Sequence, residues 1–286
     1  MPRLLLCTDL DRTVLPNGPQ PESRGARRQF AALATRPEVT LVYVTGRHRD
    51  LVEQAIANYC LPRPDYVIGD VGTTVFEVTE DGWRLWEAWQ QEIAPDWAGK
   101  TPADISALLG DIKVLRLQET AKQNVHKLSY YVPLYVEQDA LISRIRQRLT
   151  AHDVRASLVW SVDEPAAVGL LDVLPARANK LHAVEFLMRQ QGFSVAETVF
   201  AGDSGNDLPV LASALPAVLV ANASEEVRQA ALQQVAANGH PDALYIAHGA
   251  LPGMNGNYSA GVLEGVVHFI PEARHWLDEP RLAETS

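Results

Sequence analysis

Short apolar runs bounded by polar residues recur near both ends of this chain and predict buried strands. The clearest runs cover residues 4–7, 39–44, 66–68, 198–201 and 217–220. Between them lie segments with the composition or apolar spacing of helices, including residues 22–33 and 50–59. Strands that alternate with helices are typical of a parallel α/β sheet. We therefore predict a Rossmann-like core with helices on both faces of the sheet.

The alternation of strands and helices is lost between about residue 80 and residue 167. Residues 125–132 alternate as in a one-sided sheet, and Leu141, Ile145 and Leu149 mark an amphipathic helix. The apolar run at 169–174 then predicts a return to the core. We interpret the middle of the chain as an inserted α+β domain, which divides the chain into a first core part (1–79), the insertion (80–168) and a second core part (169–286).

Four tryptophans lie in the first part of the insertion, and they admit two interpretations. Trp83, Trp86, Trp89 and Trp97 could form a surface on which a sugar stacks, or they could belong to a hydrophobic core. Aromatic side chains are more often buried than exposed for ligand binding, so a core role is the simpler interpretation. The sequence alone leaves both open.

Composition narrows the classes of function. The chain has 286 residues, of which 47% are hydrophobic and 21% charged, and its net charge is -10. An acidic chain is a poor partner for nucleic acid. We recognise neither a membrane-spanning run nor a signal peptide, so we expect a cytoplasmic protein without a membrane partner. Cys7 and Cys60 give no disulfide framework.

Carboxylates gather at the carboxyl ends of two predicted strands, where open α/β sheets place their chemistry. Asp9 and Asp11 follow the first strand, one residue apart, and Asp203 and Asp207 follow the strand at 198–201 together with Asn206. Such acidic residues can also serve only in turns and helix caps. Two carboxylates, an amide and two glycines in one strand-to-helix turn favour ligation of a hard cation instead.

Two further groups complete a resemblance. Thr45, Gly46 and Arg47 follow the second strand, and Lys180 opens a predicted helix, where a bound anion would offset its charge against the helix dipole. With Asp9-Leu10-Asp11-Arg12-Thr13 and residues 202–207, these residues match in order and spacing the four motifs of the haloacid dehalogenase-like (HAD-like) phosphatases. The chain is identified as a member of that superfamily, and its insertion resembles the C2-type cap of the sugar-phosphatase branch.

The resemblance implies a role for each motif residue. Asp9 is expected to attack phosphorus and Asp11 to act as general acid and base. Thr45 and Lys180 are expected to hold the phosphoryl oxygens. A Mg²⁺ ion is expected on Asp9, the main-chain carbonyl of Asp11 and Asp203, with Asp207 and Asn206 beside it, either as ligands, through water or by orienting neighbouring groups. Arg12 stands where many relatives carry Asn or Gly. This departure leaves the expected nucleophile and acid intact and concerns only the structure of the local loop.

Residues 69–76, 172–180 and 258–265 are similar to sucrose-phosphate phosphatases, so we expect sucrose 6-phosphate as substrate. Another glycosyl phosphate, such as mannosylfructose phosphate, or a non-catalytic binding domain remains an alternative. We expect a monomer, with association with a sugar-phosphate synthase left open. The residues expected to bind the substrate are Thr45, Gly46, Arg47, His48, Lys127, Tyr130, Lys180 and Asn206.

Overall fold

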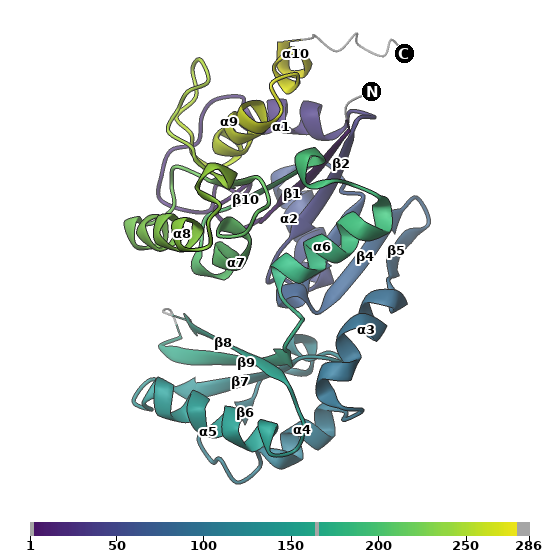
Figure 1. The fold of residues 1–286 in the computed structure, drawn as a ribbon, viewed down its shortest axis with the longest axis vertical. Coiled ribbons are helices and arrows are strands. Elements are labelled where there is room, and N and C mark those ends of the chain that lie inside the picture. Colours follow the sequence, from purple (N-terminus) through teal and green to yellow (C-terminus); the bar gives the residue numbers. More distant parts are fainter. Residues whose placement is uncertain (1–2, 164–165, 279–286) are drawn as a thin grey trace. The chain divides into compact units, whose positions relative to one another are not determined.

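The computed structural model describes residues 3–163 and 166–278 (Figure 1). Contacts between residues divide the chain into two units, residues 1–85 with 183–286 and residues 86–182. The first unit is therefore built from both ends of the chain, and the second is inserted between them. Among residues 3–163 and 166–278, none of the helices combines the length and the apolar composition of a transmembrane span.

The first unit is built on an eight-stranded sheet in the order β12-β11-β10-β1-β2-β3-β4-β5. The six strands from β12 to β3 pair in parallel, and β4 and β5 add an antiparallel edge. The strands are β1 (Leu4–Thr8), β2 (Val39–Val44), β3 (Tyr66–Gly69), β4 (Thr74–Thr79), β5 (Gly82–Leu85), β10 (Thr198–Gly202), β11 (Ala217–Leu219) and β12 (Leu244–Ile246). This arrangement confirms the α/β class that the apolar runs predict.

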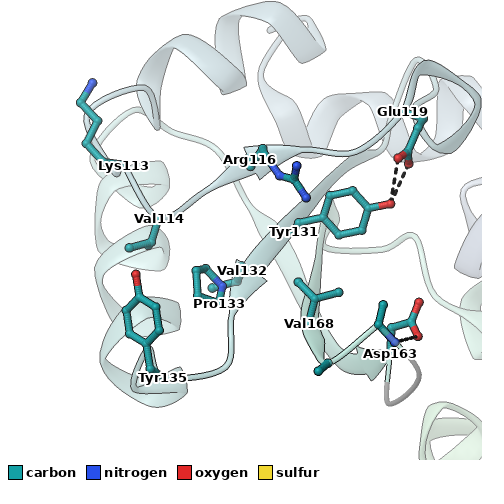
Figure 2. Close-up of a pocket in the computed structure, with 12 residues that line it drawn as sticks. Lys113, Val114, Arg116, Glu119, Tyr131, Val132, Pro133, Tyr135, Asp163 and Val168 are labelled. Atoms are coloured by element: carbon teal, nitrogen blue, oxygen red, sulfur yellow. Dashed lines mark hydrogen bonds between the residues drawn. The ribbon is translucent and has the colours of Figure 1, made fainter.

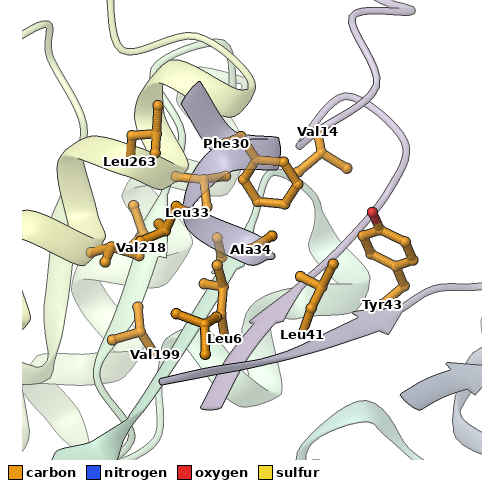
Figure 3. Packing of buried hydrophobic residues seen from close by; sticks show 14 of the residues in the cluster. Leu6, Val14, Phe30, Leu33, Ala34, Leu41, Tyr43, Val199, Val218 and Leu263 are labelled. Carbon is orange, nitrogen blue, oxygen red and sulfur yellow. The ribbon is translucent and has the colours of Figure 1, made fainter. Parts of the chain in front are cut away.

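All five residues of β1 are buried, so neither face of the sheet is open to solvent at its centre. Leu4 and Leu6 pack with Phe30, Leu33 and Leu263 in one hydrophobic cluster (Figure 3). The helices assigned to the first unit are α1 (Ala26–Ala34), α2 (Arg49–Tyr59), α7 (Leu208–Leu211), α8 (Glu225–Ala237), α9 (Ser259–Phe269) and α10 (Ala273–Asp278). Helix α6 (Lys180–Gln191) spans the division between the units, which falls after His182.

The second unit carries an antiparallel sheet in the order β6-β7-β9-β8. Its strands are β6 (Arg116–Leu117), β7 (Leu128–Pro133), β8 (Ala156–Asp163) and β9 (Val168–Pro175). Its helices are α3 (Glu87–Ile93), α4 (Pro102–Leu108) and α5 (Gln138–Thr150). One face of the sheet packs on α4 and α5 through Val132, Leu171, Ile105 and Ile145. An α+β unit is thus inserted into the parallel core.

Both ends of the insertion differ from the predicted boundaries. Strand β5 pairs with β4 in the core sheet, so the core continues to Leu85 rather than residue 79. Strand β9 covers the apolar run at 169–174, but it pairs with β7 and β8 rather than with the core. The prediction of a core strand there was wrong, because a buried apolar run does not specify which sheet contains it.

Two of the four tryptophans are buried, as the core interpretation expects. Trp89 and Trp97 are among the largest fully buried side chains. Trp97 packs in the core of the second unit, and Trp83 lies edge-on to Phe76 in the first unit. Because Trp89 and Trp97 are inaccessible to solvent, they do not form the surface on which a sugar could stack.

Candidate active site

The predicted site residues of the core follow three neighbouring parallel strands. Strand β1 lies between β10 and β2, so the residues after each strand emerge at one edge of the sheet. The main-chain N–H of Asp9 still donates to the carbonyl of Ala201, at 2.9 Å, which continues the β1–β10 pairing by one residue. Asp203 follows β10 directly. The carboxylates of Asp9 and Asp203 are brought together in this way.

Three carboxylates form a compact acidic group, which we call the acidic cluster: Asp9, Asp203 and Asp207. One oxygen from each lies within 4.8 Å of the others. All three residues are buried, with exposed fractions of 5%, 5% and 0%. Closely spaced buried carboxylates repel one another unless protons or cations offset their charge. Oxygen ligands at this spacing suit Mg²⁺ or another hard divalent cation.

The orientation of Asp207 is fixed by its neighbours. Its Oδ2 atom accepts hydrogen bonds from the main-chain N–H groups of Asp203 and Ser204, both at 3.1 Å, and from the Ser204 hydroxyl at 3.2 Å. A Cβ atom at Gly202 would lie 2.5 Å from the Asp207 side chain, closer than such contacts occur. Glycine at position 202 is therefore required for the carboxylate of Asp207 to approach the end of β10.

The side chain of Asp11 is not part of the acidic cluster. Its two carboxylate oxygens accept hydrogen bonds from Arg47, from Nε at 2.7 Å and from Nη2 at 2.6 Å. Asn17 donates a third hydrogen bond, also at 2.7 Å. The hydrogen bonds to Asp11 raise the pKa of the Arg47 guanidinium. The carboxylate of Asp11, one of the four residues predicted to bind metal, is thus occupied by Arg47 and Asn17, and the contact of its main-chain carbonyl with a metal stays a prediction.

The residues after β2 are held by main-chain contacts. Thr45 is buried, its N–H donates to the Ile68 carbonyl at 2.8 Å, and its hydroxyl accepts from the N–H of Arg47 at 3.2 Å. Gly46 is exposed between them, and His48 precedes α2. Asp70 and Val71 adopt positive φ angles of 51° and 60°, which bring the N–H of Asp70 to the Arg47 carbonyl at 3.0 Å.

The remaining predicted site residues have different environments. Lys180 is buried as the first residue of α6, and Asn206 is exposed with its side-chain oxygen accepting from Ser204. Lys127 is buried just before β7. Tyr130 lies in the hydrophobic core of the second unit with 3% of its surface exposed. Alternate residues of β7 face the helices, so Tyr130 packs in this core, and its predicted contact with a sugar stays a prediction.

The second unit also carries an open hollow of about 840 Å³ (Figure 2). The guanidinium of Arg116 lies 4.8 Å from the centre of the Tyr131 ring, and the Tyr131 hydroxyl donates to Glu119. Neither Lys127 nor Tyr130 is among the described residues that line it. Tyr131, the neighbour of Tyr130 with the opposite orientation, was not predicted as a ligand contact.

Sequence reasoning did not predict three polar contacts at and beside the acidic residues. Asn17 binds Asp11, Arg12 approaches Asp203, and the buried side chain of Asn222 donates to the Arg12 carbonyl at 2.7 Å. Asn17 lies in a loop rich in Pro, Asn and Gly, which offers no distinguishing signal. Asn222 is 210 residues from Arg12, so no local pattern predicts their contact.

Comparisons with known proteins place this chain among HAD-like phosphatases. The profile of the sucrose-6F-phosphate phosphohydrolase family matches residues 2–270. A HAD-like hydrolase of Nitrosococcus oceani is 55% identical over 279 residues, which cover 98% of this chain and 75% of the relative. A mannosylfructose-phosphate phosphatase of Agrobacterium fabrum is 30% identical over 98% of this chain and 99% of its own.

A solved structure shows the same fold. The sucrose-phosphatase of Synechocystis, determined with sucrose and phosphate, superimposes with a TM-score of 0.72. The alignment covers 94% of this chain and 98% of that one, at 23% sequence identity. The similarity therefore extends over both the parallel core and the inserted unit.

Proposed function

The chain belongs to the sucrose-6F-phosphate phosphohydrolase family and is a HAD-like phosphoric monoester hydrolase, and we propose that its substrate is sucrose 6-phosphate. The products would be sucrose and phosphate. The observation that carries the proposed phosphatase chemistry is the acidic cluster at the carboxyl end of β1, where Asp9 directly follows the strand. A buried carboxylate beside a cation site is suited to attack a phosphoryl group.

In the proposed mechanism, Asp9 attacks phosphorus and the bond to the sugar oxygen breaks, which leaves an aspartyl-phosphate on Asp9. Asp11 gives a proton to the leaving oxygen and then takes a proton from the water that attacks the aspartyl-phosphate. Release of phosphate regenerates Asp9. The two carboxylates have separate environments, one in the acidic cluster and one beside Arg47. Because Arg47 favours the ionised form of Asp11, the acid step requires Asp11 to leave Arg47 and take up a proton, whereas the base step uses the carboxylate as it stands.

The acidic cluster fits a Mg²⁺ ion, because its three buried side chains present only oxygen ligands. Asp9, Asp203 and Asp207 would hold the ion together with the main-chain carbonyl of Asp11. The bound ion would offset charge on the phosphoryl oxygens. Thr45 and Lys180 would bind those oxygens.

We propose that the inserted unit acts as the cap and that Lys127 and the residues around it contribute to recognition of the sugar. Gly46, His48 and Asn206 are proposed to contact the substrate from the core. If sugar binding helps to assemble the site, a matched disaccharide phosphate will react much faster than a small monophosphate. The proposal for the sugar rests on the family match, since the described contacts identify no sugar.

Phosphate release from a panel of substrates tests the proposal. The panel is sucrose 6-phosphate, mannosylfructose phosphate, trehalose 6-phosphate, glucose 6-phosphate and an aryl phosphate. We expect sucrose 6-phosphate to exceed the others in kcat/KM by roughly two orders of magnitude, or about 3 kcal/mol of transition-state binding. A flat profile would contradict the proposed specificity.

Mannosylfructose phosphate is the second candidate substrate, and one observation favours it. The relative that is 30% identical over nearly the whole of both chains is named a mannosylfructose-phosphate phosphatase. If kcat/KM were higher for this compound than for sucrose 6-phosphate, mannosylfructose phosphate would replace sucrose 6-phosphate as the proposed substrate. The proposed mechanism would stand. Preference for a nucleotide phosphate would contradict the sugar-phosphatase assignment of the site.

A further inference from the structure

Arg12 has an unusual backbone conformation for its residue type. Its φ angle of 58° lies in the left-handed region, which side chains other than Gly, Asn and Asp adopt at a cost. Three contacts hold it there. Its N–H donates to Asn17 at 2.8 Å, its carbonyl accepts from Asn222 at 2.7 Å, and its Nη2 donates to the Asn222 carbonyl at 3.2 Å. The direction of the Arg12 side chain is therefore fixed by the surrounding structure.

The fixed guanidinium lies beside the acidic cluster. Nε of Arg12 is 3.4 Å from Oδ2 of Asp203, and Thr13 donates to Oδ1 of the same carboxylate at 3.5 Å. Among the described residues, the buried Nε atom has no hydrogen-bond partner. The interaction with Asp203 is thus an ion pair without a formed hydrogen bond. The interaction joins a carboxylate that is 5% exposed to an arginine side chain that is 42% exposed, so an attraction remains that water screens in part.

We propose that Arg12 is an internal counter-cation that lowers the affinity of the acidic cluster for a divalent cation. Its charge offsets part of the repulsion among Asp9, Asp203 and Asp207 when no metal is bound. The positive charge of Arg12 repels a cation that enters the cluster. The cation must also share the Asp203 carboxylate with Arg12. The inference rests on the proposed metal site. It adds that this chain tunes the site with a residue outside the expected ligand set.

Magnesium binding to the whole protein tests the inference without reference to turnover. Isothermal calorimetry and thermal unfolding would be measured after removal of metal with EDTA and dialysis. In Arg12→Asn the charge is removed, and asparagine tolerates the left-handed conformation. We expect this variant to bind Mg²⁺ roughly tenfold more tightly than wild type. At a fixed subsaturating Mg²⁺ concentration, its Tm should rise by more than the wild-type Tm does.

Two further variants separate charge from other effects. Arg12→Lys keeps a positive charge on a flexible side chain and should retain most of the wild-type affinity. Arg228→Gln removes one charge from α8, where Arg228 pairs with Glu225, and should leave Mg²⁺ affinity unchanged. If Arg12→Asn bound Mg²⁺ as tightly as wild type or more weakly, the inference alone would be overturned. The same would follow if Arg12→Lys bound Mg²⁺ as tightly as Arg12→Asn does. Absence of Mg²⁺ binding to wild type would overturn the proposed metal site and this inference with it.

Discussion

Arg47 binds both carboxylate oxygens of Asp11, through hydrogen bonds of 2.7 and 2.6 Å. The two residues come from the ends of adjacent strands, β2 and β1, and the side chain of Asp11 is 42% exposed. A planar guanidinium fits a carboxylate with two parallel bonds, and an ammonium group cannot do so. The orientation of Asp11 therefore depends on arginine, rather than on any positive charge, at position 47.

We expect Arg47→Lys to lower kcat/KM for phosphate release by roughly tenfold or more, since Asp11 loses the orientation that it needs as general base. Arg49→Lys is the matched control, because Arg49 lies two residues away and pairs with Glu53 on the surface of α2. Steady-state assays on both variants would measure the difference. Equal activity of the two variants would exclude a specific role for the paired hydrogen bonds from Arg47 to Asp11.

Asp9→Asn should lower phosphate release by at least roughly a thousandfold, because an amide of similar shape cannot attack phosphorus. The fold should remain, since the main-chain bond of residue 9 to Ala201 is unaffected. Turnover assays and circular dichroism would measure the two effects. Asp81→Asn, in the turn between β4 and β5, is the control. Substantial turnover by purified Asp9→Asn would remove this residue from the mechanism.

Removal of divalent cations should abolish activity and lower the Tm, because the three carboxylates of the acidic cluster repel one another without a bound cation. Addition of Mg²⁺ should restore both properties. Calcium should bind and inhibit, since its larger size and looser geometry would displace Asp9 from attack. Thermal unfolding with EDTA, Mg²⁺ and Ca²⁺ measures this directly. Full activity after exhaustive chelation would contradict the metal site.

Gly202→Ala should destabilise the protein by about 2 kcal/mol and weaken Mg²⁺ binding, because the new methyl group would displace Asp207. Gly205→Ala is a close control three residues further on, where an added Cβ meets nothing within 4 Å. Urea unfolding of the two variants gives the difference in free energy. Similar stability of both variants would show that the end of β10 adapts to the added methyl group.

The stability of the second unit should depend on the protonation of His126. Burial lowers the pKa of this side chain, whose Nδ1 lies 2.7 Å from the Gln90 oxygen. The unfolded chain therefore binds a proton that the folded protein does not, and stability falls as the pH drops below about 6.5. His126→Gln should reduce this loss in urea unfolding between about pH 5 and pH 8. The exposed His240→Gln should preserve the loss.

The sequence predicts the core strands well, because buried parallel strands consist of continuous apolar runs such as β1 and β2. It also predicts that Asp9 and Asp203 meet, because both follow such strands. It fails for β9, since the run at 169–174 is equally compatible with the core sheet and with the inserted sheet. Local patterns identify a strand and do not identify its partners.

Side-chain partners at the site are less predictable than its carboxylates. The Arg47 contact with Asp11 and the Asn222 contact with Arg12 depend on how separate loops pack after the strands have paired. Tyr130 and Tyr131 show the same limit at the scale of one residue. Alternation along β7 establishes that they point to opposite faces, and only the packing of α4 and α5 decides which face is buried.

The position of β1 between β2 and β10 also affects the order in which the protein becomes functional during synthesis. Asp9 is translated before the insertion, whereas its partners Asp203 and Asp207 follow only after the whole insertion has been translated. A nascent chain can pair β1 with β2 early and yet lacks two of the three carboxylates of the acidic cluster. Pairing across so long a stretch of chain is slow. Phosphatase competence is therefore delayed until most of the polypeptide has been made.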